Sequence, residues 1–232
     1  MASSLSATLC LPVGAPGALE QAVELLRCGE LVAFPTDTVY GLGAHAFQPA
    51  AVARLYAVKE RPARLPIPLL LPDPAVLPDV CTDISPLVRQ LAEHFWPGAL
   101  SLVLRRVSRV PDVVTAGGPT VAVRVPDHPL VRELCRRLGA PLAATSANRH
   151  GRPPPVTAGA VEAALAGRIP LILDGGPCPG GVASTVLDLT VSPPVVLRHG
   201  PVTIEQLAAL VPFGPAPDET RGQAPDEARR PD

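Results

Sequence analysis

A lysine and an arginine two residues apart, Lys59 and Arg61, are the side chains of this sequence best suited to bind a polyphosphate. An ammonium is a compact point charge, whereas a guanidinium is a planar fork that can hold two oxygens. The pair falls at the end of a predicted helix, where basic side chains are also typical as partners of the helix dipole. It therefore indicates a phosphate site only if other polar segments lie beside it.

Composition singles out two residues. Lys59 is the only lysine beside 19 arginines, and Asn148 is the only asparagine. The abundance of Ala, Pro, Gly and Arg suggests a coding sequence that favours G and C, in which a replaceable lysine or asparagine tends to be lost. Arginine cannot reproduce a point charge, and serine cannot reproduce an amide that both donates and accepts. We interpret both residues as candidates for chemistry, with survival by chance as the alternative.

Three further polar segments leave or flank predicted strands, at residues 36–43, at 146–152, and at 184–185 together with Arg198. The sequence Thr-Ser-Ala-Asn at 145–148 could hold a phosphate or a ribose, or form a turn. The glycine pairs at 175–176 and 180–181 could bring backbone N–H groups to an anion, or form an ordinary loop. Tyr40 is either a core residue or a lid over a ligand. Because ligands of open α/β sheets bind beyond strand ends, we expect these segments to share one site.

The elements that position these segments follow from apolar periodicity. Helices are predicted at 19–26, 49–59, 85–95, 129–138 and 157–166, with a short one after the capping box at 203–206. Strands are predicted at 31–34, 67–71, 100–105, 120–125, 142–145, 171–173, 184–189 and 195–198. Because several strands follow one another without a helix, we predict an α/β fold with a twisted, mixed sheet of about seven strands flanked by helices.

The composition sets limits on domains and location. The sequence predicts one catalytic domain at 1–213 and a disordered Pro- and charge-rich tail at 214–232. The chain has no apolar run long enough for a membrane span, and no basic residue precedes the apolar part of its N-terminus, so we predict neither a membrane protein nor a signal peptide. Five scattered cysteines without CxxC spacing favour the cytoplasm.

Missing motifs argue against several classes of site. The sequence contains no P-loop, no GxGxxG after a strand and no GxSxG. Its histidines show no metal-ligand spacing, so no metal is expected from protein side chains. Without the tail, acidic and basic groups are nearly equal in number, and aromatic residues make up 3%. These features disfavour strong binding of single-stranded nucleic acid.

An ordered set of motifs resembles the YrdC/Sua5 family of threonylcarbamoyl-AMP synthases. The set covers about residues 17–211 and consists of FPTDTVYGLGAHAF, LYAVKERP, IPLLL, FWPGALSLVL, TVAVRVPDHP, PLAATSANRHGRP, LILDGG, STVLDL and VVLRHG. The resemblance implies a YrdC-like fold, also described as like DHBP synthase RibB, in the short, single-domain form. It implies a nucleotidyltransferase that converts L-threonine, bicarbonate and ATP into threonylcarbamoyl-AMP, pyrophosphate and water. ATP would be a substrate, with Mg²⁺. The reaction would be the first step of N6-threonylcarbamoyladenosine modification of position 37 in ANN-decoding tRNAs.

The resemblance also implies roles for individual residues. Lys59 and Arg61 match a K-x-R pair facing the phosphates and would be catalytic. The L-threonine contacts would be Thr38, Arg124, Ala144 and Ser184, and the further ATP contacts Thr120, Ser146, Asn148 and Arg198. The tRNA would be met directly or through the downstream threonylcarbamoyl-transferase complex.

The chain departs from the family pattern at two places. Residues 64–72 replace a usual Asn-Pro-Leu segment by a longer one, and prolines occupy 153–155 where many members carry a serine. Two alternative functions remain at this point. One is a module that binds double-stranded RNA or tRNA, and the other is a relative that adenylates carbamoyl phosphate.

Overall fold

The computed structural model describes residues 7–213, so the predicted disordered tail lies outside the described residues. The helices are α1 (Ala18–Arg27), α2 (Pro49–Lys59), α3 (Leu77–Val80), α4 (Pro86–Phe95), α5 (Asp112–Thr115), α6 (Pro129–Leu138), α7 (Ala158–Leu165) and α8 (Ile204–Ala208), with a 3₁₀ turn at Pro74–Val76. The strands are β1 (Leu9–Pro12), β2 (Val32–Phe34), β3 (Gly41–His45), β4 (Leu69–Leu70), β5 (Leu100–Arg105), β6 (Thr120–Arg124), β7 (Leu142–Ser146), β8 (Leu171–Asp174), β9 (Thr185–Asp188) and β10 (Val195–Arg198).

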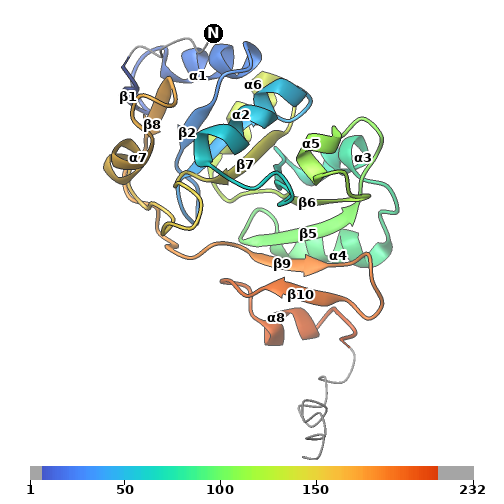
Figure 1. Ribbon diagram of the computed structural model, residues 1–232. Coiled ribbons are helices and arrows are strands. Elements are labelled where there is room, and N and C mark those ends of the chain that lie inside the picture. The colour runs from blue at the N-terminus through green and yellow to red at the C-terminus, as the bar shows by residue number, and fades with distance from the viewer. Residues whose placement is uncertain (1–6, 214–232) are drawn as a thin grey trace, which may run out of the picture.

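These strands form one mixed sheet in the order β1-β8-β2-β3-β7-β4-β6-β5-β9-β10 (Figure 1). The pairs β1–β8, β2–β8, β4–β6 and β5–β9 are parallel, and the other neighbours are antiparallel. The two-residue strand β4 joins the halves of the sheet, since it pairs with β7 on one side and β6 on the other. The predicted α/β fold with a mixed sheet is confirmed.

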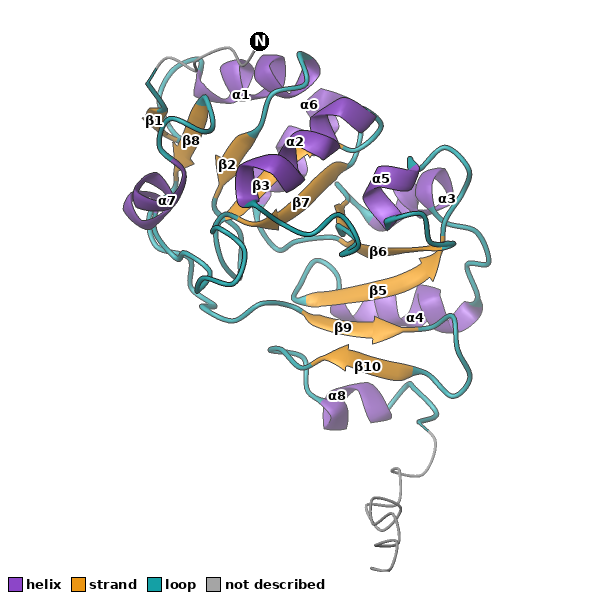
Figure 2. Ribbon diagram, in the orientation of Figure 1, coloured by secondary structure: helices purple, strands orange, loops and turns teal. Residues whose placement is uncertain are grey.

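Two apolar clusters cover the two faces of the sheet, because successive strand residues point to opposite sides. On β7, Ala143 belongs to the larger cluster with α2, α4 and α7, whereas Leu142 and Ala144 belong to a second cluster with α1 and α6. Figure 2 shows α1 and α6 beside the strands of the first half, while β5, β9 and β10 lie in the other half. The second face is thus packed against α1 and α6 near β2, β7 and β8.

The sheet has ten strands rather than about seven. Strand β3 was missed because its two glycines lower β propensity. They are needed there: a Cβ at Gly41 or Gly43 would lie 2.8 or 2.7 Å from the ring of Phe34 on the neighbouring strand. Strand β1 is short and largely exposed. The helices α3 and α5 span four residues each, too few to show a helical period.

The predicted helix starts of α4 and α8 are confirmed. The Ser85 hydroxyl accepts a hydrogen bond from the Val88 N–H at 3.3 Å, and Thr203 and Gln206 form the reciprocal bonds of a capping box. Among the described helices, none has the length and apolar character needed to cross a lipid bilayer.

Candidate functional site

A cavity of about 160 Å³ lies on the second face of the sheet, beside β4, β5 and β6, where the cover of α1 and α6 ends. Leu70 and Ala144 mark this transition, since they belong to the α1–α6 cluster and also line the cavity. The other lining residues come from the β2–β3 loop, the segment after α2, the strands β5, β6 and β7, and the two ends of the β9–β10 hairpin: Thr36, Thr38, Val39, Tyr40, Gly41, Arg61, Pro68, Ser101, Arg124, Thr145, Ser146, Ala183, Ser184 and Arg198.

The β2–β3 loop forms one wall, and hydrogen bonds of its hydroxyl groups hold its shape. The Thr36 hydroxyl donates to the Val39 carbonyl at 2.7 Å and accepts from the N–H groups of Thr38 and Val39. The hydroxyl oxygens of Thr36 and Thr38 lie 2.9 Å apart. Thr38 also accepts a hydrogen bond from the Arg124 guanidinium at 3.2 Å. Thr38 is thus held beside Arg124 in the cavity wall.

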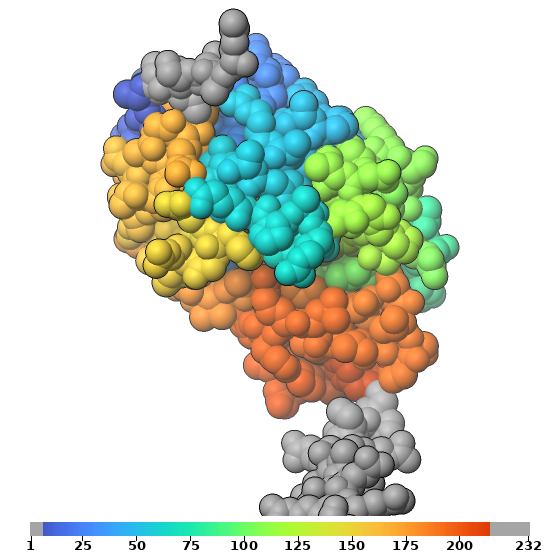
Figure 3. Space-filling model, viewed as in Figure 1, coloured from blue at the N-terminus to red at the C-terminus, as the bar shows by residue number. Residues whose placement is uncertain are grey.

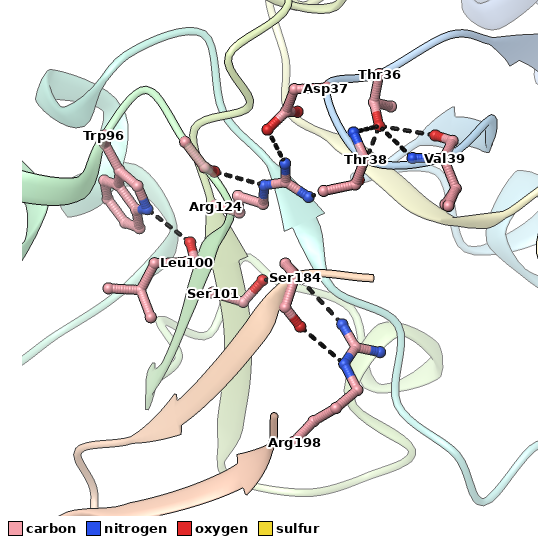
Figure 4. Close-up of polar contacts among 11 residues, drawn as sticks. Thr36, Asp37, Thr38, Val39, Trp96, Leu100, Ser101, Arg124, Ser184 and Arg198 are labelled. Carbon is pink, nitrogen blue, oxygen red and sulfur yellow. Dashed lines mark hydrogen bonds and ion pairs between the residues drawn. The ribbon is translucent and has the colours of Figure 1, made fainter. Parts of the chain in front are cut away.

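Arg124 is held in place on three sides (Figure 4). Its Nε donates to the Gly98 carbonyl at 2.7 Å, and its two terminal nitrogens donate to Thr38 and to the carboxylate of Asp37. The residue is 6% exposed. Burial lowers the pKa of Arg124, and the neighbouring Asp37 opposes this effect. A guanidinium fixed in this way can present its remaining N–H groups to an anion without further ordering.

Ser184 and Arg198 form the opposite wall, at the two ends of the hairpin. The Arg198 guanidinium donates from Nε to the Ser184 carbonyl at 2.9 Å and from Nη2 to the Ser184 hydroxyl at 3.0 Å. The register of β10 against β9 shifts between Val196 and Arg198, so Leu197 is an extra residue. Such a bulge redirects the following side chain. It explains why Leu197 is 59% exposed while Arg198 faces the cavity.

Three guanidinium groups line the same cavity, from Arg61, Arg124 and Arg198. Figure 3 shows the surface where the chain after α2 borders the C-terminal strands. Arg61 donates to the carbonyls of Leu65 and Pro66 at 3.3 and 3.1 Å. Burial lowers the pKa of Arg198, and the positive charges of Arg124 and Arg61 lower it further. Cations that disfavour one another's charge across a half-buried cavity make it a site for an anion.

Lys59 lies behind the cavity wall rather than in it, since it is absent from the lining and 2% exposed. Its ammonium donates to the main-chain carbonyls of Ser146 and Asn148. Burial lowers its pKa to about 8, and Arg61 contributes to the shift. Lys59 thus does not face the cavity in this structure, and its contact with phosphates stays a prediction. The lysine holds the segment that carries Ser146, which does line the cavity.

Asn148 is also a structural member of this segment. Its amide nitrogen donates to the carbonyls of Arg149 and Arg152, and its buried Oδ1 has no hydrogen-bond partner among residues 7–213. It does not line the cavity. Thr120 is likewise outside the lining, roughly 13 Å from Arg124 along β6 at about 3.3 Å per residue. A ligand that touches both ends of β6 would have to extend along this strand.

Tyr40 lines the inner end of the cavity, yet its side chain belongs to the core, with no exposed surface. Its hydroxyl donates to the Gly176 carbonyl at 2.9 Å and accepts from the Gly175 N–H at 3.2 Å. Burial raises its pKa to about 12. Of the two interpretations of Tyr40, core residue or lid, the structure shows a buried core residue whose hydroxyl is held by the backbone of Gly175 and Gly176.

The structure thus brings together eight of the predicted site residues, namely Thr38, Tyr40, Arg61, Arg124, Ala144, Ser146, Ser184 and Arg198. Sequence reasoning missed Asp37, Thr36 and Ser101. A signal existed for Ser101, which is the one hydroxyl inside the apolar run of β5. Asp37 lay inside a motif but gave no indication that it pairs with Arg124. The segment 64–72, which departs from the family pattern, contributes Pro68 and Leu70 to the cavity wall.

The chain is similar to known proteins in both sequence and structure. The Sua5/YciO/YrdC family model, described as "Telomere recombination", matches residues 24–200. The chain is 46% identical to the threonylcarbamoyl-AMP synthase of Bacillus subtilis and 43% identical to that of Pyrococcus abyssi, over 83% and 82% of its length. It spans 56% of the length of each of these curated relatives. The structure of P. abyssi Sua5 complexed with L-threonine matches 88% of this chain and 61% of that one, with a TM-score of 0.86 and 40% identity.

Proposed function

Because this chain belongs to the Sua5/YciO/YrdC family, we propose that it is a threonylcarbamoyl-AMP synthase acting on L-threonine, bicarbonate and ATP. The observation that carries the proposal is the cavity lined by Arg124, Arg61 and Arg198 together with the hydroxyl-bearing residues Thr38 and Ser184. Such a site offers cations and hydrogen bonds but no nucleophile activated by a base. It suits a reaction in which the substrates supply all the bonds that change.

The proposed reaction has two steps. The amine of L-threonine attacks the carbon of bicarbonate, and loss of water leaves a carbamate. A carbamate oxygen then attacks the α-phosphorus of ATP, the bond to the bridging oxygen breaks, and pyrophosphate leaves with its electron pair. The protein has to position the reactants and stabilise the charge that moves to the leaving group. Guanidinium groups that are already ordered perform this task without reorganisation.

We assign the amino acid to the end of the cavity formed by Arg124, Thr38, Ala144 and Ser184. The guanidinium of Arg124 would hold the carboxylate, and Asp37 keeps that guanidinium in its orientation. The inert wall of Ala144 and Leu70 would pack the threonine methyl group. A pocket of this kind favours threonine over serine by roughly 1–3 kcal/mol, the usual value for one methyl group.

We assign the triphosphate to the end of the cavity that carries Arg61 and Arg198. Ser146 would contact the nucleotide, and Lys59 and Asn148 would support it by shaping the 146–148 segment. Thr120 would be reached only by the more distant part of the nucleotide. Mg²⁺ would arrive on the phosphates, because the described cavity lining is rich in guanidinium groups and carries no carboxylate.

The product would be used in the threonylcarbamoyl modification of tRNA, either by direct contact with tRNA or through a transferase complex. We place the reaction in the cytoplasm, which agrees with the five unpaired cysteines among the described residues.

Product analysis tests the proposal. The purified protein is incubated with ATP, Mg²⁺, L-threonine and bicarbonate, and the products are identified by mass spectrometry while pyrophosphate is measured. We expect pyrophosphate release to require both L-threonine and bicarbonate, because the carbamate is the nucleophile. Equal release without threonine would refute the proposal.

A further inference from the structure

Ser101 carries a buried hydroxyl that has no role in the proposed reaction as described above. It lies on β5 between Leu100 and Leu102, whose side chains point into the larger core cluster. Because side chains alternate along a strand, Ser101 points to the other face, where it lines the cavity. It is 3% exposed, and its hydroxyl oxygen lies 2.9 Å from that of Ser184. A hydroxyl buried at this depth is costly unless it has partners.

The hydrogens of this contact can be counted. Arg198 donates to the Ser184 hydroxyl oxygen, so Ser184 is an acceptor on that side. The two serines carry one hydroxyl hydrogen each, and one of these two hydrogens must lie between their oxygens. The other hydrogen is left over. Whichever serine keeps it, the pair offers the cavity a single O–H donor.

The charge of Arg198 favours one direction. When a cationic N–H donates to a hydroxyl, that hydroxyl becomes a stronger donor, and successive bonds aligned in the same direction strengthen one another. The aligned order runs from Arg198 to Ser184 and from Ser184 to Ser101 (Figure 4). Ser101 is then the end of the series, and its hydrogen is the one directed at the occupant of the cavity.

The opposite wall also carries a guanidinium. Arg124 donates to the Thr38 hydroxyl, and both residues line the cavity. A ligand between the walls therefore meets the Arg124 guanidinium on one side and, on the other, a hydroxyl donor backed by the guanidinium of Arg198. This arrangement fits a molecule with anionic oxygens.

We propose that Ser101 is a substrate-binding residue that donates its hydroxyl hydrogen to an anionic carboxylate-type oxygen of the bound amino acid, as the last member of a series that begins at Arg198. This inference rests on the proposed function. The oxygen belongs either to the carboxylate of threonine or to the carbamate formed from its amine. Both are planar groups with a negative charge shared by two oxygens, so both present the same acceptor.

Two nearly isosteric variants test the hydroxyl itself. Ser101→Thr keeps the hydroxyl and adds a methyl group, whereas Ser101→Val has almost the same shape as the threonine variant but has no hydroxyl. We expect Ser101→Val to raise the KM for L-threonine about tenfold relative to Ser101→Thr, the effect of one hydrogen bond to a charged acceptor. The KM for ATP should differ between the two by less than about twofold, because the hydroxyl does not face the phosphates.

A control variant measures the effect of removing a buried hydroxyl that lies outside the cavity. Thr115 on α5 is 4% exposed, bonds only weakly to the Asp112 carbonyl at 3.4 Å and does not line the cavity. Thr115→Val should leave the KM for L-threonine at the wild-type value. Thermal unfolding of all three variants checks that they are folded at the assay temperature.

Calorimetry with L-threonine in the absence of bicarbonate shows whether the carboxylate of threonine or the carbamate supplies the anionic oxygen. If the threonine carboxylate is the acceptor, the Kd for L-threonine differs between Ser101→Thr and Ser101→Val. If the carbamate is the acceptor, this Kd is equal and the KM for bicarbonate differs instead. Equal values of all three constants in two folded variants would overturn the role of Ser101 while wild-type turnover upholds the proposed function. Wild-type protein without threonine-dependent pyrophosphate release would overturn both.

Discussion

The ammonium of Lys59 donates a hydrogen bond to the main-chain carbonyl of Asn148, so the only lysine and the only asparagine of the chain are in direct contact. A second bond from the same ammonium reaches the Ser146 carbonyl. In return, the Lys59 carbonyl accepts from the His150 N–H at 2.9 Å. The end of α2 and the 146–150 segment are therefore joined in both directions. The segment that carries Ser146 into the cavity depends on this junction.

Replacing Lys59 by arginine should lower turnover at least tenfold, equivalent to about 1.4 kcal/mol of barrier. The larger guanidinium cannot occupy the space between two carbonyls and the end of α2 without moving the 146–148 segment. Because Lys59 is buried, the larger arginine side chain overpacks its site, which should cost about 1–3 kcal/mol of stability. Pyrophosphate release and urea unfolding measure the two effects. Wild-type turnover in the folded variant would show that the segment adapts.

The pH dependence of stability should also report on Lys59. Its pKa in the folded protein is about 8, compared with 10.5 for a free side chain. Between these values the unfolded chain holds a proton that the folded chain has released, so the free energy of unfolding rises with pH. Comparison with Lys59→Met isolates this contribution, because other titrating groups are shared. From pH 8 to 10.5, wild type should gain on the order of 3 kcal/mol relative to the variant. A constant difference in urea unfolding would contradict the shift.

Replacing Asp37 by asparagine should destabilise the protein by about 3 kcal/mol, because it leaves the buried guanidinium of Arg124 without its ionic partner. The same change at Asp112 is the matched control. Asp112 pairs with Arg106, but its side chain is 77% exposed, so Asp112→Asn should cost less than about 1 kcal/mol. Urea unfolding at neutral pH compares the two. Equal effects would mean that burial does not determine the importance of the Asp37–Arg124 pair.

Replacing Gly200 by alanine should separate Arg198 from Ser184. A Cβ at position 200 would lie 2.4 Å from both the Ala183 carbonyl oxygen and the Thr185 nitrogen, so the backbone has to shift. We expect turnover to fall at least tenfold, roughly 1.4 kcal/mol of barrier, because two hydrogen bonds between these residues are disturbed. Gly159→Ala is the control, since its Cβ would meet no atom within 4 Å and alanine favours the helix α7. Pyrophosphate release by both variants, with melting curves, distinguishes the site effect from a general one.

The sequence alone determined the fold class, most of the elements and the set of segments that meet at the cavity. Apolar periodicity and helix caps are local properties, so α4 and α8 could be placed with their starts at Ser85 and Thr203. The motifs named Thr38, Arg124, Ser184 and Arg198, and the structure brings them to one cavity because each lies at or beside the end of a strand of the same sheet. Composition selected Lys59 and Asn148, although it could not say what they do.

Only the tertiary structure decided which atoms these residues contact. Lys59 lies behind the cavity wall because the end of α2 packs against a segment almost 90 residues later in the chain, and no local pattern encodes such a contact. Asp37 and Arg124 are 87 residues apart, and their pairing depends on the register of the strands between them. The direction of the hydroxyl of Ser101 follows from its place on β5, but its partner Ser184 is set by the parallel pairing of β5 with β9. The residue types indicated which side chains could bind an anion. Which groups they contact, and which of them donates in each hydrogen bond, depended on the three-dimensional structure.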